Sequence, residues 1–238
     1  MKELSRLQSI DICNFLTKIR EDTFKIVSLN VVSLQKHFKD VKADQDMKGT
    51  EVIMLQETSL TGLMFQPNNY YLGPQYRSKF INLSKGKGIA AYFPNTFKST
   101  GEFYNGSYQM ITIESHTLAI TNIYRAQYAT ATFNIDLKKC LTAVGHKDHL
   151  IIGDFNLCIR KDINHEVMNI LKEHGYKTIN SIFHKPPEPT QIKGRSIDQA
   201  WIKLVSNRVS LIDHSIKTCV YSDHEKVKVE LFLTDTDT

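Results

Sequence analysis

The sequence predicts an α+β domain in which two packed, mixed β-sheets are flanked by helices. Three observations lead to this prediction. Short apolar and β-branched runs recur over the full length, few segments carry the helical period, and no repeat or low-complexity linker divides the chain. With 238 residues, of which 41% are hydrophobic, the chain is long enough for one domain with a sizeable core.

The expected strands are short and are spread along the whole domain. An apolar, β-branched run bounded by polar or glycine-containing segments is typical of a strand. This pattern predicts strands at 24–32, 51–56, 88–93, 109–114, 118–124, 148–153, 196–203, 208–213, 215–220 and 227–233.

Helices are expected where apolar residues recur every three or four positions. Residues 131–144 place Phe133 and Leu137 on one side, and residues 162–174 follow the same spacing. Residues 34–47, between the first two strands, are expected to form one helix.

The chain is expected to have three parts. Residues 1–22 form an amphipathic helical extension, because Leu4, Leu7 and later apolar residues keep a roughly helical period. We expect this helix to pack on the domain, with contact to a partner protein as the alternative. The domain covers residues 23–233, and residues 234–238 form a polar tail.

The composition indicates a soluble intracellular protein. The formal charge of +5 suits a polyanionic substrate, although many proteins without such a substrate are equally basic. The four cysteines lack metal-site or redox spacing, which favours reduced thiols and a reducing compartment. No secretory signal and no run of about 20 apolar residues is present, so no membrane association is expected.

A set of polar residues follows the ends of apolar runs. A buried strand delivers such a residue to the edge of the core, and four carboxylates gathered there would repel one another without a cation. Oxygen-rich sites of this kind suit Mg²⁺ or Mn²⁺, and a nearby histidine can supply a proton or stabilise an oxyanion. This chemistry hydrolyses phosphate esters. The residues are Asn30, Glu57, Asp154, Asn156, Asp198, Asp223 and His224.

Taken in order, these segments resemble the endonuclease/exonuclease/phosphatase superfamily. The resemblance covers about residues 24–233 and implies the DNase-I-like four-layer αββα sandwich. Its motifs are Leu29-Asn30-Val31, Leu55-Gln56-Glu57-Thr58, Ile123-Tyr124, Gly153-Asp154-Phe155-Asn156, Ser196-Ile197-Asp198 and Ser222-Asp223-His224.

On the metal side of the site, the resemblance implies three residues. Glu57 would be the main ligand of Mg²⁺ or Mn²⁺. Asn30 would lie beside it and help to place the metal or its water, and Asp223 would contribute from the opposite side.

On the phosphate side, the resemblance implies a catalytic group of five. Asp154 would orient or deprotonate the attacking water, and Asn156 would hydrogen-bond that water or the phosphate. His224 would stabilise charge on the phosphoryl oxygens, with Asp198 fixing its orientation. Tyr124 would contact the phosphate or polarise the leaving group.

Two segments depart from the superfamily pattern. Arg125 follows the tyrosine where a proline is frequent nearby, and it is either a phosphate ligand or a solvated loop residue. Glu225 and Lys226 follow His224 where the superfamily usually turns apolar, which leaves the local geometry open. Read singly, Asp154 and Asn156 could also be ordinary turn residues after a strand.

The stretch from residue 189 to residue 198 most resembles endonuclease domains of mobile elements such as non-LTR retrotransposons. It fits the inositol polyphosphate phosphatase, tyrosyl-DNA phosphodiesterase and abasic-site repair branches less well. The expected activity is therefore metal-dependent nicking of DNA that leaves a 3′-hydroxyl, in the nucleus or in association with a virus. The alternatives are a phosphomonoesterase or a lipid or inositol phosphatase, and a non-catalytic binding module.

Overall fold

The computed structural model describes residues 23–61, 65–84, 86–183 and 186–234. The helix expected for residues 1–22 and all but Thr234 of the expected tail lie outside the described residues. None of the described helices is long and apolar enough to span a membrane. Three cysteines fall in the described ranges, and Cys140, Cys158 and Cys219 are all buried, free thiols.

Within the described chain, one sheet has six strands: β1 (Phe24–Asn30), β2 (Val52–Gln56), β3 (Arg77–Ile81), β4 (Ile89–Phe93), β11 (Val209–Lys217) and β12 (Lys226–Leu233). Their order is β11-β12-β1-β2-β4-β3. The first and second strands of the chain, β1 and β2, run parallel, while every other neighbouring pair is antiparallel.

The second sheet also has six strands in the described chain: β5 (Lys98–Asn105), β6 (Tyr108–Glu114), β7 (Leu118–Arg125), β8 (Asp148–Asp154), β9 (Lys177–Thr178) and β10 (Asp198–Lys203). Their order is β5-β6-β7-β8-β10-β9, with β7 and β8 parallel. Each sheet therefore contains one parallel pair near its centre.

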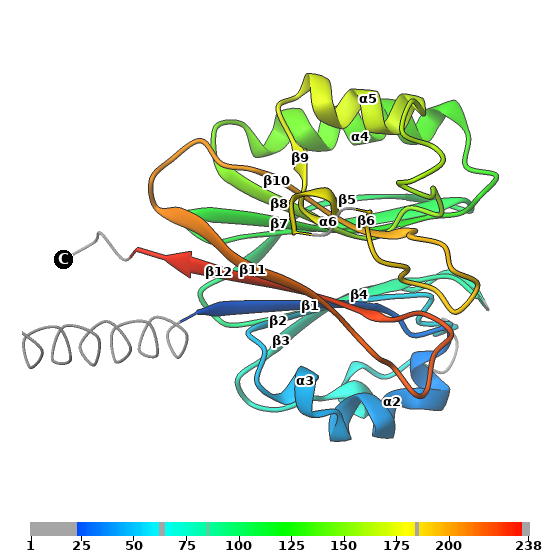
Figure 1. Ribbon diagram of the computed structural model, residues 1–238. Helices are drawn as coiled ribbons and strands as arrows, with labels where there is room; N and C mark the ends of the chain where they lie inside the picture. The colour runs from blue at the N-terminus through cyan, green and yellow to red at the C-terminus, as the bar shows by residue number, and fades with distance from the viewer. Residues whose placement is uncertain (1–22, 62–64, 85, 184–185, 235–238) are drawn as a thin grey trace, which may run out of the picture.

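Most helices of the described chain cover the outer faces of the two sheets. The helices are α2 (Leu34–Ala43), α3 (Gln45–Lys48), α4 (Ala131–Val144), α5 (Glu166–Glu173) and α6 (Ile179–Phe183), with a 3₁₀ turn η1 (Pro67–Tyr70). Figure 1 shows α2 and α3 below the first sheet and α4 and α5 above the second. This arrangement confirms the predicted four-layer αββα sandwich.

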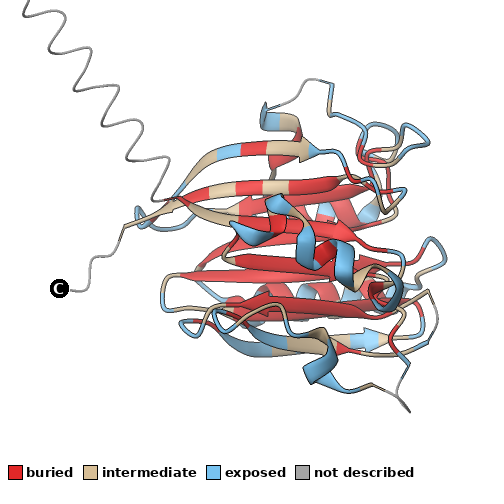
Figure 2. Ribbon diagram, turned by 90° about the horizontal axis from the view of Figure 1, so that it is seen from below, coloured by how far each residue is buried: buried red, intermediate tan, exposed pale blue. Residues whose placement is uncertain are grey.

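Most central strands are buried on both faces, which explains why they look like continuous apolar runs in the sequence. Side chains alternate between the faces of a strand, so Ile26 joins the core between the sheets while Val27 packs toward the helices below. Phe133 and Trp201 belong to a third cluster, between the second sheet and its helices. Figure 2 shows the buried strands at the centre and exposed residues on the outer helices.

Two predicted boundaries are wrong. The strands expected at 208–213 and 215–220 form one strand, β11, which is interrupted only by a register irregularity between Leu211 and Asp213. The helix expected at 34–47 breaks at Asp44, whose extended backbone ends α2 and whose side chain caps α3.

Three strands were not predicted: β3, β5 and β9. β3 and β5 are edge strands, and their exposed polar residues hide the alternation that marks a half-buried strand. β9 has two residues, too few to produce any pattern.

Gly153 is required where β8 pairs with β7, opposite Ile123. Its φ is +142°, and a Cβ there would lie 2.0 Å from the carbonyl oxygen of Ile123. We expect Gly153→Ala to lower the free energy of unfolding by about 2–4 kcal/mol, because it adds both backbone strain and a steric clash. Urea unfolding measures the loss.

Gly49→Ala is the matched control, because a Cβ at Gly49 would meet nothing within 4 Å. We expect this variant to keep the wild-type stability or to gain up to about 1 kcal/mol. Equal effects of the two substitutions would contradict the close approach of β8 to β7.

Candidate active site

The polar residues that end the parallel strands lie at one edge of the sandwich. β1 and β2 end together, which brings Asn30 near Glu57, the residue after β2. β7 and β8 also end together, so Tyr124 is paired with Asp154. β10 begins at this edge, where Asp198 is paired with Asp154. Two parallel pairs, one in each sheet, thus bring residues far apart in sequence to a single site.

The side-chain amide of Asn30 links the two sheets. Its Nδ2 donates hydrogen bonds to Glu57 Oε1 and to Asp154 Oδ2, each at 3.0 Å. Its Oδ1 accepts from the backbone N–H of Val32 at 3.0 Å. Since only the oxygen can accept from that N–H, the amide orientation is determined. Asn30 therefore clamps the two carboxylates, and its predicted role beside a metal stays a prediction.

Glu57 lies on a strained backbone beside a buried tyrosine. Its φ is +50°, in the left-handed region that few residues other than glycine adopt. Burial raises the pKa of the Glu57 carboxyl, although the hydrogen bond from Asn30 and the charge of His224 oppose the shift. Burial, together with the charges of Glu57 and Asp154, raises the pKa of Tyr124. The Tyr124 hydroxyl thus keeps its proton and donates it in a hydrogen bond to Glu57.

Asp154 is fully buried and held by Asn156. The backbone N–H of Asn156 donates to Asp154 Oδ1 at 2.8 Å, and its Nδ2 donates to Asp154 Oδ2 at 3.2 Å. Asn156 also has a left-handed backbone, with φ at +50°. Burial first, and then the nearby charge of Asp198, raises the pKa of Asp154 well above that of an ordinary carboxyl.

His224 and Asp198 form a buried pair. His224 Nδ1 lies 2.9 Å from Asp198 Oδ2 and 3.1 Å from Asp198 Oδ1. Burial of the ring opposes its protonation, but the charge and hydrogen bond of Asp198 more than offset this and raise the pKa of His224 to about 9. The ring is consequently positively charged at neutral pH. Its Nε2 lies 3.4 Å from Gln191 Nε2 and 3.9 Å from Asp223 Oδ1.

Two residues that the sequence motifs contain, but to which no role was assigned, connect the loops of the site. Thr190 Oγ1 accepts from the N–H of Asp198 at 2.9 Å, and the Thr190 carbonyl accepts from the N–H of Glu225 at 2.8 Å. Ser222 Oγ donates to the carbonyl of Asn30 at 2.6 Å. Nothing in the sequence shows these partners, since each bond joins distant segments; only the position of each residue in a motif could have singled it out.

Arg125 and Asp223 lie differently from the rest of the predicted set. Arg125 ends β7 and is only 5% exposed, with its guanidinium over the Phe133 ring at 5.7 Å and Nη1 donating to the carbonyl of Phe155 at 3.4 Å. The alternative of a solvated loop arginine is therefore wrong. The Asp223 side chain is 49% exposed, with Oδ1 3.9 Å from His224 Nε2. It belongs to the open rim of the site.

The donor set fits a hard divalent cation. Among the described residues, potential ligand atoms of Asp154, Asp198 and His224 lie within 4.8 Å of one another. A cation on His224 Nδ1 would have to displace the hydrogen bond to Asp198, so the Glu57 side of Asp154 suits it better. The raised pKa values of Glu57 and Asp154 reflect buried negative charge that a cation would compensate.

A cleft of about 390 Å³ opens beside Glu57, the one residue of the site among those that line it. Its other lining residues carry no formal charge and include three hydroxyl side chains: Val32, Ser33, Gln35, Ser59, Thr61 and Gly86. The site is thus a charged, buried cluster whose Glu57 borders an open cleft.

Solved structures share this architecture. The AP endonuclease LMAP from Leishmania major matches with a TM-score of 0.71 and 14% identity, over 90% of this chain and 88% of that one. The human Nocturnin catalytic domain gives 0.61 and 15%, over 90% and 94%. The 3′-5′ exonuclease NExo from Neisseria meningitidis gives 0.69 and 15%, over 88% and 100%.

No family model and no curated protein matches the sequence. At identities of 14% and 15%, the likeness shows the fold, which is the DNase-I-like four-layer sandwich.

The charge of Asp198 raises the pKa of both His224 and Asp154. We expect Asp198→Asn to move both titrations to lower pH, with His224 shifting from about 9 toward the ordinary range of histidine. NMR titration of the metal-free protein, with ring signals for His224 and carboxyl signals for Asp154, measures both shifts. An unchanged His224 titration in the variant would show that Asp198 does not hold the proton on the ring.

Proposed function

We propose that the chain is a divalent-metal-dependent phosphodiesterase that nicks DNA and leaves a 3′-hydroxyl. The observation that carries the proposal is the double hydrogen bond from Asn30 to Glu57 and Asp154, beside the buried pair of Asp198 and His224. This arrangement supports the proposal because a cation site, a base for water and a positively charged donor would then lie together at one edge of the sandwich.

The residues divide the chemistry between them. Asp154 has a raised pKa and can accept the proton of an attacking water near neutral pH. His224 is charged at that pH, and its Nε2 would donate to a phosphoryl oxygen in place of its contact with Gln191. Asp198 keeps the ring in one orientation by holding Nδ1.

The remaining predicted residues support this core. Glu57 would hold the metal, with Asp223 contributing from the rim, and the metal would supply Lewis-acid stabilisation of the phosphate charge. Asn156 keeps its backbone N–H and side-chain amide on Asp154, which directs that carboxylate. Tyr124 presents a protonated hydroxyl between Glu57 and the substrate. Arg125 adds a buried positive charge at the end of β7, and its Nη1 donates to the carbonyl of Phe155.

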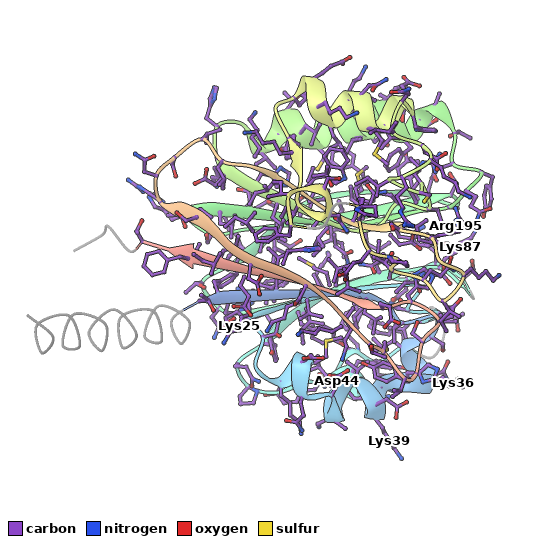
Figure 3. All side chains as sticks on the ribbon, viewed as in Figure 1. Lys25, Lys36, Lys39, Asp44, Lys87 and Arg195 are labelled. Atoms are coloured by element: carbon purple, nitrogen blue, oxygen red, sulfur yellow. The ribbon has the colours of Figure 1, made fainter. Side chains whose placement is uncertain are left out.

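Four observations support DNA as the substrate. The formal charge of +5 favours a polyanion. Figure 3 places Lys36, Lys87 and Arg195 at the end of the sandwich where β1 and β2 deliver the site. Solved structures of the same fold include an AP endonuclease and a 3′-5′ exonuclease. The resemblance of residues 189–198 to mobile-element endonucleases points the same way.

One observation favours a second candidate, hydrolysis of a terminal phosphate. A further structural match, at a TM-score of 0.67 and 15% identity, is described as a 3′ phosphatase from Neisseria bound to product DNA hairpin. The same Asp154 and His224 geometry would serve a phosphomonoester. Release of inorganic phosphate from a 3′-phosphorylated hairpin, without cutting of its backbone, would favour this candidate over nicking.

We expect the protein to convert supercoiled plasmid to the nicked circle with Mg²⁺ or Mn²⁺, and to lose this activity with a chelator. Glu57→Gln removes the principal charge for the cation, and His224→Ala removes the donor to the phosphoryl oxygen. Each should lower the nicking rate about 10²- to 10³-fold, as the loss of one transition-state donor does elsewhere. Agarose gels read the nicking, and extension by a DNA polymerase reports the 3′-hydroxyl.

His146→Ala is the control, because this exposed histidine lies between α4 and β8, at the opposite end of the strands. It should nick at the wild-type rate. If the wild type fails to cut any phosphodiester with either metal, the proposal is overturned, and nicking that survives both active-site substitutions would overturn the site assignment.

A further inference from the structure

The loop of residues 218–225 joins β11 to β12 and carries His224 into the site. On the side facing the site, Ser222 Oγ donates to the carbonyl of Asn30, and the N–H of Glu225 donates to the carbonyl of Thr190. The Glu225 side chain accepts from the N–H of Cys219 at 2.7 Å, which closes the loop on itself. These contacts hold one side of the loop only.

The other side of the loop is tied to the break between α2 and α3 by a buried ion pair. Lys226 Nζ lies 2.8 Å and 3.0 Å from the two carboxylate oxygens of Asp44, and 2.6 Å from Asp46 Oδ2. The Lys226 side chain is 5% exposed and that of Asp44 is 8% exposed. Burial opposes the charge on the lysine, but the bonds to Asp44 and Asp46 leave its pKa above the ordinary value.

Tyr221 adds a second tie from the loop to the same carboxylate. Its hydroxyl donates to Asp44 Oδ2 at 2.8 Å, and its ring stacks on His37 of α2 at 5.8 Å. Asp44 also accepts from the N–H of Asp46 at 2.9 Å as the cap of α3. One carboxylate therefore binds the loop, the following strand and the helix start together.

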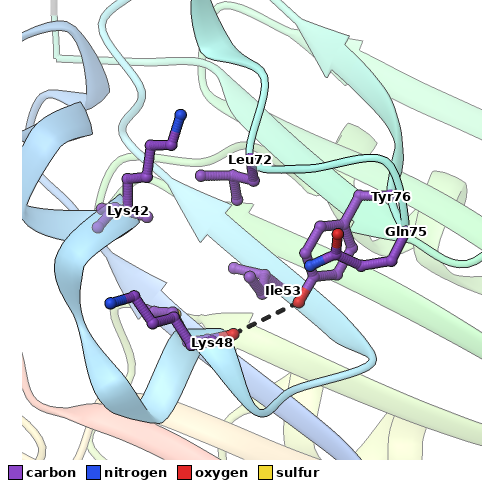
Figure 4. Close-up of a pocket in the computed structure, with 8 residues that line it drawn as sticks. Lys42, Lys48, Ile53, Leu72, Gln75 and Tyr76 are labelled. Atoms are coloured by element: carbon purple, nitrogen blue, oxygen red, sulfur yellow. Dashed lines mark hydrogen bonds between the residues drawn. The ribbon is translucent and has the colours of Figure 1, made fainter.

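The break between the helices is itself well anchored. Thr50 Oγ1 donates to the carbonyl of Asp46 at 2.5 Å, and the hydroxyl of Tyr76 donates to the carbonyl of Met47 at 3.4 Å and also to that of Thr50. Figure 4 shows Tyr76 across a small cleft of about 50 Å³ that borders α3 and β2. Figure 3 places Asp44 between this corner and the sheet. The anchor to which the loop is tied is thus part of the rigid scaffold.

We propose that Lys226, Asp44 and Tyr221 act as a lock that positions His224 for the reaction. The proposal rests on the function proposed above. Lys226 lies two residues after His224, so a shift of the start of β12 would move the ring relative to Asp198. A buried ion pair is weak evidence for stability, because well-packed apolar side chains often replace one without loss. Its consequence here is orientation, and the three are positioning residues.

The test is the paired variant Asp44→Asn/Lys226→Met, which removes the ion pair of the lock without leaving Asp44 as an unpaired buried charge. Asparagine can still cap α3. We expect kcat for DNA nicking to fall at least tenfold with KM nearly unchanged, because a small misplacement of a catalytic group mainly slows the chemical step. Lys226→Arg keeps the positive charge and can donate to both Asp44 and Asp46. This variant should retain most of the wild-type rate.

Lys228→Met is the matched control. Lys228 lies on the same strand and pairs with Glu230 at 2.7 Å, but it does not contact the loop. We expect wild-type kcat from it. If the three residues only stabilised the fold, the fully folded paired variant would have the wild-type kcat. That result would overturn the inference.

A second readout does not depend on activity. The Nδ1 proton of His224, bonded to Asp198, should give a slowly exchanging low-field NMR signal in the wild type and in Lys228→Met. We expect this signal to be lost or broadened in the paired variant. Tyr221→Phe, which retains the ion pair, should show a smaller change and keeps the test usable if the paired variant does not fold. A signal unchanged in every one of these variants that folds would overturn the lock even if the protein proved not to be a nuclease.

Discussion

The site depends on one side-chain amide that joins the two sheets. Asn30 can donate to Glu57 and Asp154 together only because β1 of one sheet and β8 of the other deliver their ends to the same edge. The backbone N–H of Val32 settles which way the amide faces. The proposed chemistry therefore depends on the packing of the two sheets, because separating the sheets would move Glu57 away from Asp154.

Holding these groups has a cost that the surrounding structure offsets. Burial raises the pKa of Glu57 and of Asp154, so the site stores unfavourable negative charge until a cation or the charged His224 compensates it. Glu57 and Asn156 also have left-handed backbones. Such strain persists only where neighbouring contacts over-determine the conformation, and here Glu57 accepts from Asn30 while the N–H of Asn156 donates to Asp154.

The second half of the site is held from outside the sheets. His224 belongs to a loop that reaches Asn30 on one side and Asp44 on the other. Asp44 can serve as that anchor because it interrupts the expected single helix, which leaves its carboxylate free to cap α3 and pair with Lys226. The unpredicted break at Asp44 and the unusual Lys226 after His224 are thus explained by one interaction, the ion pair between these two residues.

The sequence by itself determined the layers of the fold and the identity of the polar cluster. Apolar runs followed by polar residues predicted the two sheets, because strands buried on both faces leave a strong local pattern, and the order of the motifs, through the family resemblance, singled out the polar cluster. The edge strands β3 and β5 could not be predicted, since exposed strand residues leave no such apolar pattern in the sequence. Only the tertiary structure decided the orientation of Asn30, the burial of Arg125 and the bonds of Thr190 and Asp44. Each of these joins segments far apart in the chain, and no local pattern encodes which partner a side chain meets.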